Sequence, residues 1–330
     1  MNNIAGLIII FLSSVVGVYL YYIYAKKKSF LDIPNERSSH VKATPRGGGV
    51  VIAIIWFILI TWLFLMRKIE YKLFLSLLCG LPVSAIGLVD DIKVTSPKTR
   101  LFVQLISASF ALILMGGLNS VDIGYSQISG SFILSILAII GLVWFTNLFN
   151  FLDGIDGYLS SEVIFIGLAF FLLYGISTPI MLSIVTFGFL IWNWQPAKIF
   201  MGDVGSTLMG FSIGVFAVYY QTTGVSSLIV WIMLTSVFWF DASLTLFRRW
   251  RNHEQLSKAH KKHAYQRIVQ AGFSHSKTVL FAQIINLTLL ALVLLAISFP
   301  IMLIPLLALN IIYLYIIMRI IDKRFPFSTT

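Results

Sequence analysis

The stretch SFILSILAIIGLVWFTNLFNFLDGIDG (residues 131–157) joins an apolar segment to a group of polar side chains. Its first part carries no charge over a length close to the roughly 20 residues that a helix needs to cross a bilayer. Its last part carries Asn147, Asn150, Asp153 and Asp156 at intervals of three residues, with a glycine after each carboxylate. The pattern predicts a membrane-spanning helix that ends in a polar site.

The apolar pattern recurs along the whole chain. Of 330 residues, 58% are hydrophobic and 11% are charged, and the mean hydropathy is +0.91. We therefore expect an all-α, polytopic integral membrane protein with about eleven transmembrane helices; a count of ten stays open. Without a repeat, a linker or a composition shift, one membrane domain covers 1–330. The predicted spans are roughly 4–24, 49–66, 71–89, 101–117, 131–150, 161–176, 179–195, 207–222, 226–247, 278–298 and 300–321.

The basic residues predict the orientation of these spans, because Lys and Arg near span ends are retained in the cytoplasm. The first span has no Lys or Arg before it and KKK (26–28) after it, which puts the N-terminus outside. Alternating from there, all but three of the 24 Lys and Arg residues lie inside; the exceptions are Arg67, Lys68 and Lys72. The C-terminus and the longer polar loops are then expected in the cytoplasm.

The formal net charge of +11 follows from this topology, and it does not indicate a nucleic-acid partner. Anionic lipids or a phosphorylated substrate fit the charge better. The single cysteine, Cys79, excludes an intrachain disulfide.

Adjacent carboxylates, Asp90 and Asp91, end the third predicted span in GLVDDIKVTSPKTR (87–100). Two neighbouring carboxylates repel unless they share a cation or a proton, and Mg²⁺ is held by one or two carboxylates together with phosphate oxygens. The alternative is a charged cap that ends the span and has no further role.

The four polar residues of NLFNFLDGIDG (147–157) form one stripe while the helix continues. Amides and carboxylates together can coordinate a metal or hydrogen-bond a base or a ribose. The alternative is a polar stripe that joins two spans.

Asp203 lies between two glycines in IFMGDVGSTLMG (199–210), just before the eighth predicted span. Its carboxylate can reach a metal while backbone N–H groups face phosphate oxygens; a plain helix cap is the competing interpretation. Carboxylates that end three different spans at one level are expected to converge on a single cation.

Two tracts, PNERSSHVKATPRGGG (34–49) and HEQLSKAHKKHAYQRIVQAGF (253–273), supply cations. His260 and His263 are spaced for one helix face, but without a carboxylate or cysteine beside them phosphate recognition is favoured over zinc. A solvated basic loop is the alternative. Asp241, inside the ninth span, lies on the same helical face as Arg248 and could pair with a cation or act in the site.

GLVDDIK, SPKTR, NLFNFLDGIDG, FMGDVGS and HKKHAYQ occur in this order at the cytoplasmic ends of predicted spans. Together they resemble the polyprenyl-phosphate N-acetylhexosamine-1-phosphate transferase superfamily, the glycosyltransferase 4 family. PNERSSH and TPRGGG are most similar to its bacterial branch, which initiates O-antigen or related surface polysaccharides.

The resemblance implies an enzyme of the bacterial inner membrane that transfers sugar 1-phosphate from a UDP-N-acetylhexosamine to undecaprenyl phosphate and releases UMP. It implies Mg²⁺, with Mn²⁺ as a substitute, on Asp203 and Asn150. Asp90 and Asp91 match the carboxylates at the lipid phosphate, Asp153 and Asp156 match positions facing the uridine, and His263 matches a contact to the donor diphosphate.

The sequence departs from other branches of this family at two places. Ala264, Tyr265 and Gln266 stand where further histidines are found, and DDIK replaces a longer DDxxK, so Lys98 is expected to act in place of Lys93. The predicted site residues are therefore Asp90, Asp91 and Asp203 for catalysis, Asp203 and Asn150 for the metal, and Lys98, Asn147, Asp153, Asp156, His260 and His263 for substrate binding.

A secondary transporter is the rival function, with Asp153, Asp156 and Asp241 as a cation or proton path. Transporters place such groups near the bilayer midplane in repeated halves, whereas these carboxylates are predicted at one rim and no internal repeat is visible. The expected partners are undecaprenyl phosphate, the UDP-sugar and membrane lipids. The oligomeric state stays open, a homodimer included.

Overall fold

A computed structural model describes residues 4–34, 42–256, 258 and 260–327. Part of the first basic tract, residues 35–41, lies outside this range. Helices dominate the described chain, and the strands are confined to two short antiparallel hairpins. The elements are α1 (Ile4–Lys27), β1 (Leu31–Asp32), β2 (Thr44–Pro45), α2 (Gly49–Leu65), α3 (Tyr71–Leu78), α4 (Gly80–Ile92), α5 (Pro97–Met115), β3 (Ser120–Asp122), β4 (Gln127–Ser129), α6 (Ser131–Phe151), α7 (Tyr158–Tyr174), α8 (Ser177–Asn193), α9 (Asp203–Thr222), α10 (Leu228–Leu234), α11 (Ser236–Arg251), α12 (Ala264–Gln270), α13 (His275–Ser298), the 3₁₀ turn η1 (Pro300–Met302) and α14 (Leu303–Arg324).

Each of the eleven predicted segments coincides with one helix or with two consecutive helices, and the ends agree within four residues. The all-α fold class is thereby confirmed. Among the described residues, six helical segments are long and apolar enough to cross a membrane, or seven if the bent pair α10–α11 is one span. The count of eleven crossings is not confirmed by this test and stays a prediction.

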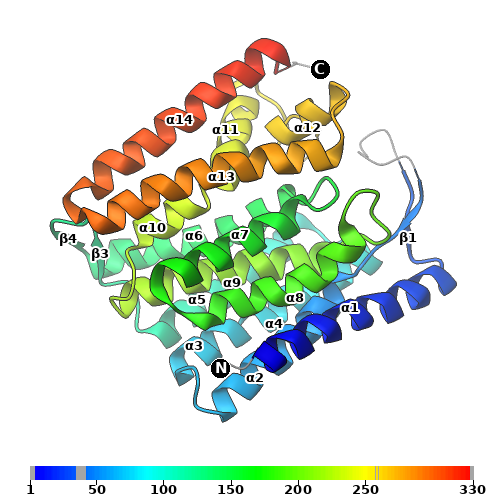
Figure 1. The fold of residues 1–330 in the computed structure, drawn as a ribbon, viewed down its shortest axis with the longest axis horizontal. Helices are drawn as coiled ribbons and strands as arrows, with labels where there is room; N and C mark the ends of the chain where they lie inside the picture. The colour runs from blue at the N-terminus through cyan, green and yellow to red at the C-terminus, as the bar shows by residue number, and fades with distance from the viewer. Residues whose placement is uncertain (1–3, 35–41, 257, 259, 328–330) are drawn as a thin grey trace.

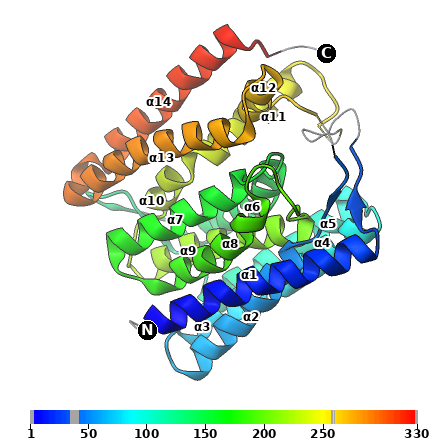
Figure 2. The same cartoon turned by 45° about the vertical axis from the view of Figure 1, so that its right-hand side comes forward.

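α9 occupies the centre of the bundle (Figures 1 and 2), where it packs against α6, α4 and α2. Every residue from Val204 to Gln221 is buried. Its sequence is rich in glycine and serine, and small side chains let neighbouring helices approach closely without a large apolar driving force. α9 is surrounded by protein, so it does not need the uniformly apolar surface by which lipid-facing spans are recognised.

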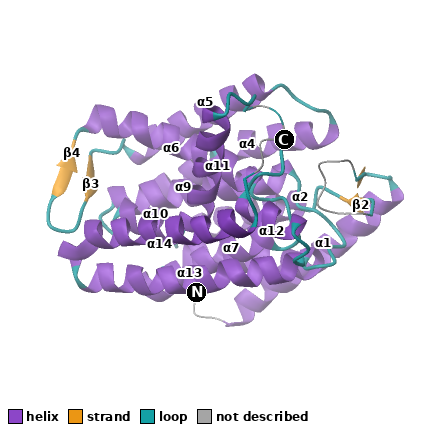
Figure 3. Ribbon diagram, turned by 90° about the horizontal axis from the view of Figure 1, so that it is seen from above, coloured by secondary structure: helices purple, strands orange, loops and turns teal. Residues whose placement is uncertain are grey.

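The long helices run side by side, with α13 and α14 along one edge of the molecule and α1 to α3 along the other (Figure 1). The two hairpins mark opposite ends of the bundle (Figure 3): β3–β4 at one end, β1–β2 at the other. The loops that follow α6 and α11 carry the predicted site residues that are not in helices: Asp153 and Asp156 in the first, His260 and His263 in the second.

α10 and α11 form a broken helix, bent by 77° between Leu234 and Ser236. Thr235 forms the break, and the carbonyl of Ile232, in the interrupted turn, accepts a hydrogen bond from the indole N–H of Trp239 at 2.7 Å. Such internal partners are required when a helix breaks away from water. The bend directs α11 toward the end of the bundle that carries α12 (Figure 2).

Candidate active site

The end of α4 meets the beginning of α9. Asp91 is buried, and its two carboxylate oxygens accept hydrogen bonds from the backbone N–H groups of Asp203 (3.1 Å) and Val204 (3.4 Å). These N–H groups are free at a helix start and carry partial positive charge, so a carboxylate there stabilises the helix. Asp91 thus fixes the first turn of α9 and, with it, the position of Asp203.

Asp90 points away from Asp91 and holds the beginning of α5. One oxygen accepts from both the backbone N–H and the hydroxyl of Thr95, at 2.6 Å each. The other accepts from Arg100 at 2.8 Å. The adjacent carboxylates therefore serve two different neighbours, which explains how they are accommodated side by side.

Arg100 and Asn150 both contact Asp203. The guanidinium of Arg100 lies 3.2 Å from one oxygen of Asp203, so this arginine bridges Asp90 and Asp203. The side-chain nitrogen of Asn150 donates to the other oxygen of Asp203 at 3.0 Å and to Ser206 at 2.9 Å. The end of α6, the beginning of α9 and the first turn of α5 thus converge, as predicted for Asn150 and Asp203.

This donor set fits a hard divalent cation. The side chains of Asp203 and Asn150 are in contact and both carry oxygen atoms, and the Asn150 side-chain oxygen makes no hydrogen bond to any residue that the structure describes. Within that range no group of three or more His, Cys, Asp or Glu side chains could hold a metal. A cation here would therefore need oxygens from substrate or water, which is how Mg²⁺ is usually bound beside phosphates.

Asp153 and Asp156 lie in the loop 152–157, because α6 ends at Phe151. The four polar residues therefore share a helical stripe only as far as Asn150, because the helix ends within one residue of the predicted span end at 150. Burial raises the pKa of Asp153 well above its ordinary range, and the negative charges of Asp203, Asp91 and Asp156 raise it further, although part of the side chain stays accessible. A cation among these carboxylates would be strongly stabilised.

Asn147 lies one turn before Asn150 but does not join the carboxylates. Its amide pairs with that of Gln104 on α5, at 2.6 Å and 3.4 Å for the two nitrogen–oxygen contacts. This is the contact expected of a polar residue that joins two helices. Lys98 is exposed on the first turn of α5, and its side chain makes no hydrogen bond or ion pair with the described residues. Arg100, two residues later, is the basic residue of this motif that contacts Asp90 and Asp203.

His260 and His263 precede α12 and are not on one helix face, which corrects that expectation; His263 is the residue before the first turn. Their rings lie close, with centroids 4.8 Å apart. Burial, with His263 and Arg249 nearby, lowers the pKa of His260 to about 3. No hydrogen bond or ion pair within the described ranges joins either histidine to Asp203.

Asp241 positions this histidine segment. Both of its oxygens accept from the backbone N–H of Ala264, at 2.9 and 3.0 Å, and Nδ1 of His263 lies 3.7 Å from one of them. Arg248 pairs instead with Asp322, so it is not the partner of Asp241. Tyr265, in the first turn of α12, donates to the carbonyl of Phe151 at 3.1 Å and so joins α12 to the loop 152–157.

Two arginines at the site were not among the predicted residues. Arg100 is one of three basic residues that follow the Asp90–Asp91 pair in 87–100, and its position on the first turn of a helix beginning at Pro97 was the available signal. Arg46 donates to the backbone carbonyl of Asp91 and stacks on Phe30 at 5.3 Å. The glycines after Arg46 let this segment pair with residues 200–201, immediately before Asp203.

The sequence matches the family model described as glycosyl transferase family 4 over residues 73–221. This range excludes the histidine segment and contains all members of what we call the carboxylate group: Asp90, Asp91, Asp153, Asp156 and Asp203. A probable undecaprenyl-phosphate N-acetylglucosaminyl 1-phosphate transferase of Bacillus subtilis (strain 168) is 29% identical over 277 residues, covering 79% of this chain and 75% of the relative.

Two further relatives carry similar names. A decaprenyl-phosphate N-acetylglucosaminephosphotransferase of Mycolicibacterium smegmatis is 30% identical over 75% of this chain and 70% of its own length. An undecaprenyl-phosphate alpha-N-acetylglucosaminyl 1-phosphate transferase of Thermotoga maritima is 34% identical over 65% of this chain and 64% of its own length. All three relatives are named as transferases, which lends no support to the transporter interpretation.

Proposed function

We propose that this chain, which belongs to glycosyl transferase family 4, the polyprenyl-phosphate hexosamine-1-phosphate transferases, transfers N-acetylhexosamine 1-phosphate from a UDP-sugar to undecaprenyl phosphate. A phosphate oxygen of the lipid attacks the phosphorus that carries the sugar. The bond from that phosphorus to the bridging oxygen breaks, and UMP leaves with this oxygen. The observation that carries the proposal is the convergence of Asp91, Asn150 and Asp203 at the first turn of α9.

The acceptor is a phosphate monoester whose second pKa is about 6, so most of it is already a dianion at neutral pH. It therefore needs positioning and charge compensation more than a strong base. Arg100 is the cation nearest to both Asp90 and Asp203, and we assign it to the acceptor phosphate, with Asp90 holding its guanidinium. Direct in-line attack, without a sugar-phosphate bound to an aspartate, is the reaction that this arrangement favours.

Asp203 and Asn150 would hold Mg²⁺. When bound, Mg²⁺ neutralises charge on the donor diphosphate and on the departing UMP. Asp91 acts on this centre indirectly, because its hydrogen bonds fix the backbone from which Asp203 projects. The loop 152–157 presents Asp153 and Asp156 next to this group, and we assign both to the nucleotide. His263 and the basic segment around it are assigned to the donor diphosphate.

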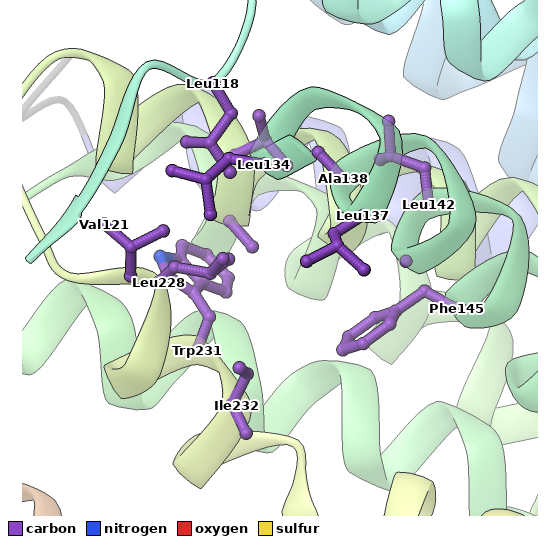
Figure 4. A pocket seen from close by; sticks show the side chains of 14 residues that line it. Leu118, Val121, Leu134, Leu137, Ala138, Leu142, Phe145, Leu228, Trp231 and Ile232 are labelled. Carbon is purple, nitrogen blue, oxygen red and sulfur yellow. The ribbon is translucent and has the colours of Figure 1, made fainter. Parts of the chain in front are cut away.

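An apolar pocket supports a prenyl acceptor (Figure 4). It has a volume of about 300 Å³ and is formed by α6, α9, α10 and the segment before and within β3. Its lining runs along α6 from Leu134 to Phe145, five residues before Asn150. A lipid tail lying in this pocket would keep its apolar surface out of water while its phosphate reaches Arg100. The initiation of O-antigen or a related surface polysaccharide remains part of the proposal.

The test is UMP release by purified protein given undecaprenyl phosphate, Mg²⁺ and a panel of UDP-N-acetylhexosamines. Wild type should release UMP with at least one donor, and chelation of Mg²⁺ should abolish this release. Asp203→Asn removes the charge that the metal would need and should lower kcat by about 100-fold or more.

Asp122→Asn provides the matched control, because Asp122 lies in β3 at the opposite end of the bundle. This variant should retain wild-type activity. Release of UMP by Asp203→Asn at the wild-type rate would refute the assigned metal site. Absence of UMP with every donor would refute the proposed reaction.

A further inference from the structure

His275, the first residue of α13, contacts Asp156 in the loop 152–157. It was not among the predicted site residues. Its side chain is buried, and Nδ1 lies 3.2 Å from the backbone nitrogen of Asp156 and 3.3 Å from a carboxylate oxygen of the same residue. The same carboxylate oxygen accepts a hydrogen bond from the backbone N–H of Ala197 at 3.1 Å.

One imidazole nitrogen cannot both accept a proton and donate one. In its neutral form, with the proton on the other nitrogen, Nδ1 accepts from the N–H of Asp156; otherwise it donates to the carboxylate. In the first case Nδ1 holds the main chain of Asp156, and in the second case it holds the side chain. The second carboxylate oxygen of Asp156 has no hydrogen-bond partner in the described part of the chain. That oxygen is therefore free to accept from a ligand.

The support behind His275 is rigid. α13 is a helix of 24 residues that begins directly at this side chain, with Ser274 as its cap. The next residue, Ser276, donates its backbone N–H to the side chain of Gln195 at 2.8 Å. Gln195 and Ala197 belong to the same loop, between α8 and α9. Three segments thus meet at Asp156: its own loop, the loop after α8 and the start of α13.

A second set of contacts holds the backbone next to Asp156. The N–H of Gly157 donates to Asn193 at 3.0 Å, and Asn193 in turn donates to the carbonyl of Ile199 at 3.0 Å. The last residue of α8 therefore already holds the backbone next to Asp156. His275 is the side chain outside these two loops that contacts both the amide and the carboxylate of Asp156. Its removal would leave the Asp156 carboxylate held by the N–H of Ala197 alone and would not disturb the other attachments of the loop.

We infer that His275 is a positioning residue for donor binding: it orients the Asp156 carboxylate so that the free oxygen accepts a hydrogen bond from the nucleotide of the donor. The inference rests on the proposed function, because it takes the nucleotide to bind at Asp156. The inference predicts an effect on one substrate and not on the other. Loss of the imidazole should weaken the binding of the UDP-sugar and leave the binding of undecaprenyl phosphate unchanged, since Arg100 and Asp90 lie on other elements.

The test compares wild type with His275→Ala, His275→Asn and Lys277→Ala in detergent-purified full-length protein. Asn places an amide near the position of Nδ1 and can accept or donate, so it should restore the contact; Lys277 is exposed in the same turn and serves as the control. His275→Ala should raise the KM for the UDP-sugar by about tenfold. Its kcat and its KM for undecaprenyl phosphate should stay within about twofold, and the other two variants should stay near wild type.

Equal donor KM values for wild type and His275→Ala would overturn the inference. So would a fall in kcat with unchanged KM, or a failure of His275→Asn to recover donor binding when both variants melt at the wild-type temperature. If wild type releases no UMP with any donor, the proposed reaction fails first. UMP binding measured by calorimetry then judges the inference: binding by wild type that His275→Ala weakens about tenfold supports it, and equal or absent binding refutes it.

Discussion

At the residue scale, Arg100 is the basic side chain that connects the carboxylates of the site. It bridges Asp90 and Asp203, whereas Lys98, the cation expected from the sequence, is exposed two residues earlier. Both residues are basic and lie in the same short motif. The sequence could not choose between them, because the choice depends on which face of α5 is turned toward α9.

Replacing each of these two basic residues by alanine tests the assignment of Arg100 to the acceptor phosphate. Arg100→Ala should lower kcat/KM for undecaprenyl phosphate by about 100-fold, because a charge-assisted contact to the acceptor phosphate is lost and two carboxylates lose their common partner. Lys98→Ala should change it by less than about twofold, as expected of an exposed charge. Initial rates of UMP release against lipid concentration provide the measurement. The opposite order of effects would return the role to Lys98.

His260 makes the histidine segment sensitive to acid. Its pKa in the folded protein is about 3, below the ordinary value of 6.5. Between these pH values the unfolded segment binds a proton that the folded segment does not, so folding of the segment is favoured less as the pH falls. The stability is fully present above pH 6.5 and is lost progressively toward pH 3. Partial exposure of the ring makes the effect smaller than the full pKa difference would give.

Limited proteolysis around His260 measures this response. Wild type should be cleaved faster at pH 5 than at pH 7.5, whereas His260→Gln should show the same cleavage at both. His253→Asn is the control, since His253 is exposed and its positive φ of 57° suits asparagine; it should keep the wild-type response. Acid-independent cleavage of wild type would show that His260 does not affect this segment.

At the scale of elements, the helices and their approximate ends were predictable, and the neighbours of some polar side chains were not. Apolar run length located every long helix, because the bilayer sets the length and composition of a span. The end of α6 at Phe151 agrees with the predicted span of 131–150, although polar residues keep a helical interval beyond it. The amide pair of Asn147 and Gln104 was hidden, because a polar residue in a span can face either a site or a neighbouring helix.

The close contact between α4 and α9 at Gly87 predicts that an added methyl group there would destabilise the protein. A Cβ at Gly87 would lie 2.8 Å from the backbone carbon and oxygen of Asp203, closer than any packing allows. Gly87→Ala should therefore push α9 away and cost about 1–3 kcal/mol of stability, together with most of the activity. Melting temperature and UMP release report the two effects.

Gly141→Ala is the matched control for this substitution. Gly141 lies in α6, where an added Cβ would meet nothing within 4 Å. Alanine favours helix over glycine by about 0.5–1 kcal/mol, so this variant should melt at or slightly above the wild-type temperature. Equal behaviour of the two variants would mean that α4 and α9 are not in close contact.

At the scale of the whole molecule, the sequence predicts an orientation that accessible cysteines can test. Cys79→Ser removes the single native thiol. In that background Tyr125→Cys reports on the β3–β4 hairpin, and Lys93→Cys reports on the end of α4; both positions are exposed. If the active site faces the cytoplasm, an impermeant maleimide should label the first in right-side-out vesicles and the second in inside-out vesicles.

The two labelling patterns should exclude each other, because the hairpins mark opposite ends of the bundle. The reverse pattern would show that the basic residues mislead about orientation here. Labelling of both thiols from one side would contradict a bundle that crosses the membrane with these ends apart. The arrangement of polar groups at one end, by contrast, could be read from the sequence, since carboxylates and glycines recur wherever a predicted span meets its longer loop.

The burial of α9 keeps the helix that carries Asp203 away from the acyl chains of the bilayer. The outer helices meet the acyl chains and would absorb changes in bilayer thickness or tension by tilting. α9, enclosed from Val204 to Gln221, has no lipid-facing residue in that range through which such a disturbance could act directly. We therefore expect the position of Asp203 to stay constant when growth temperature changes the thickness or tension of the surrounding membrane.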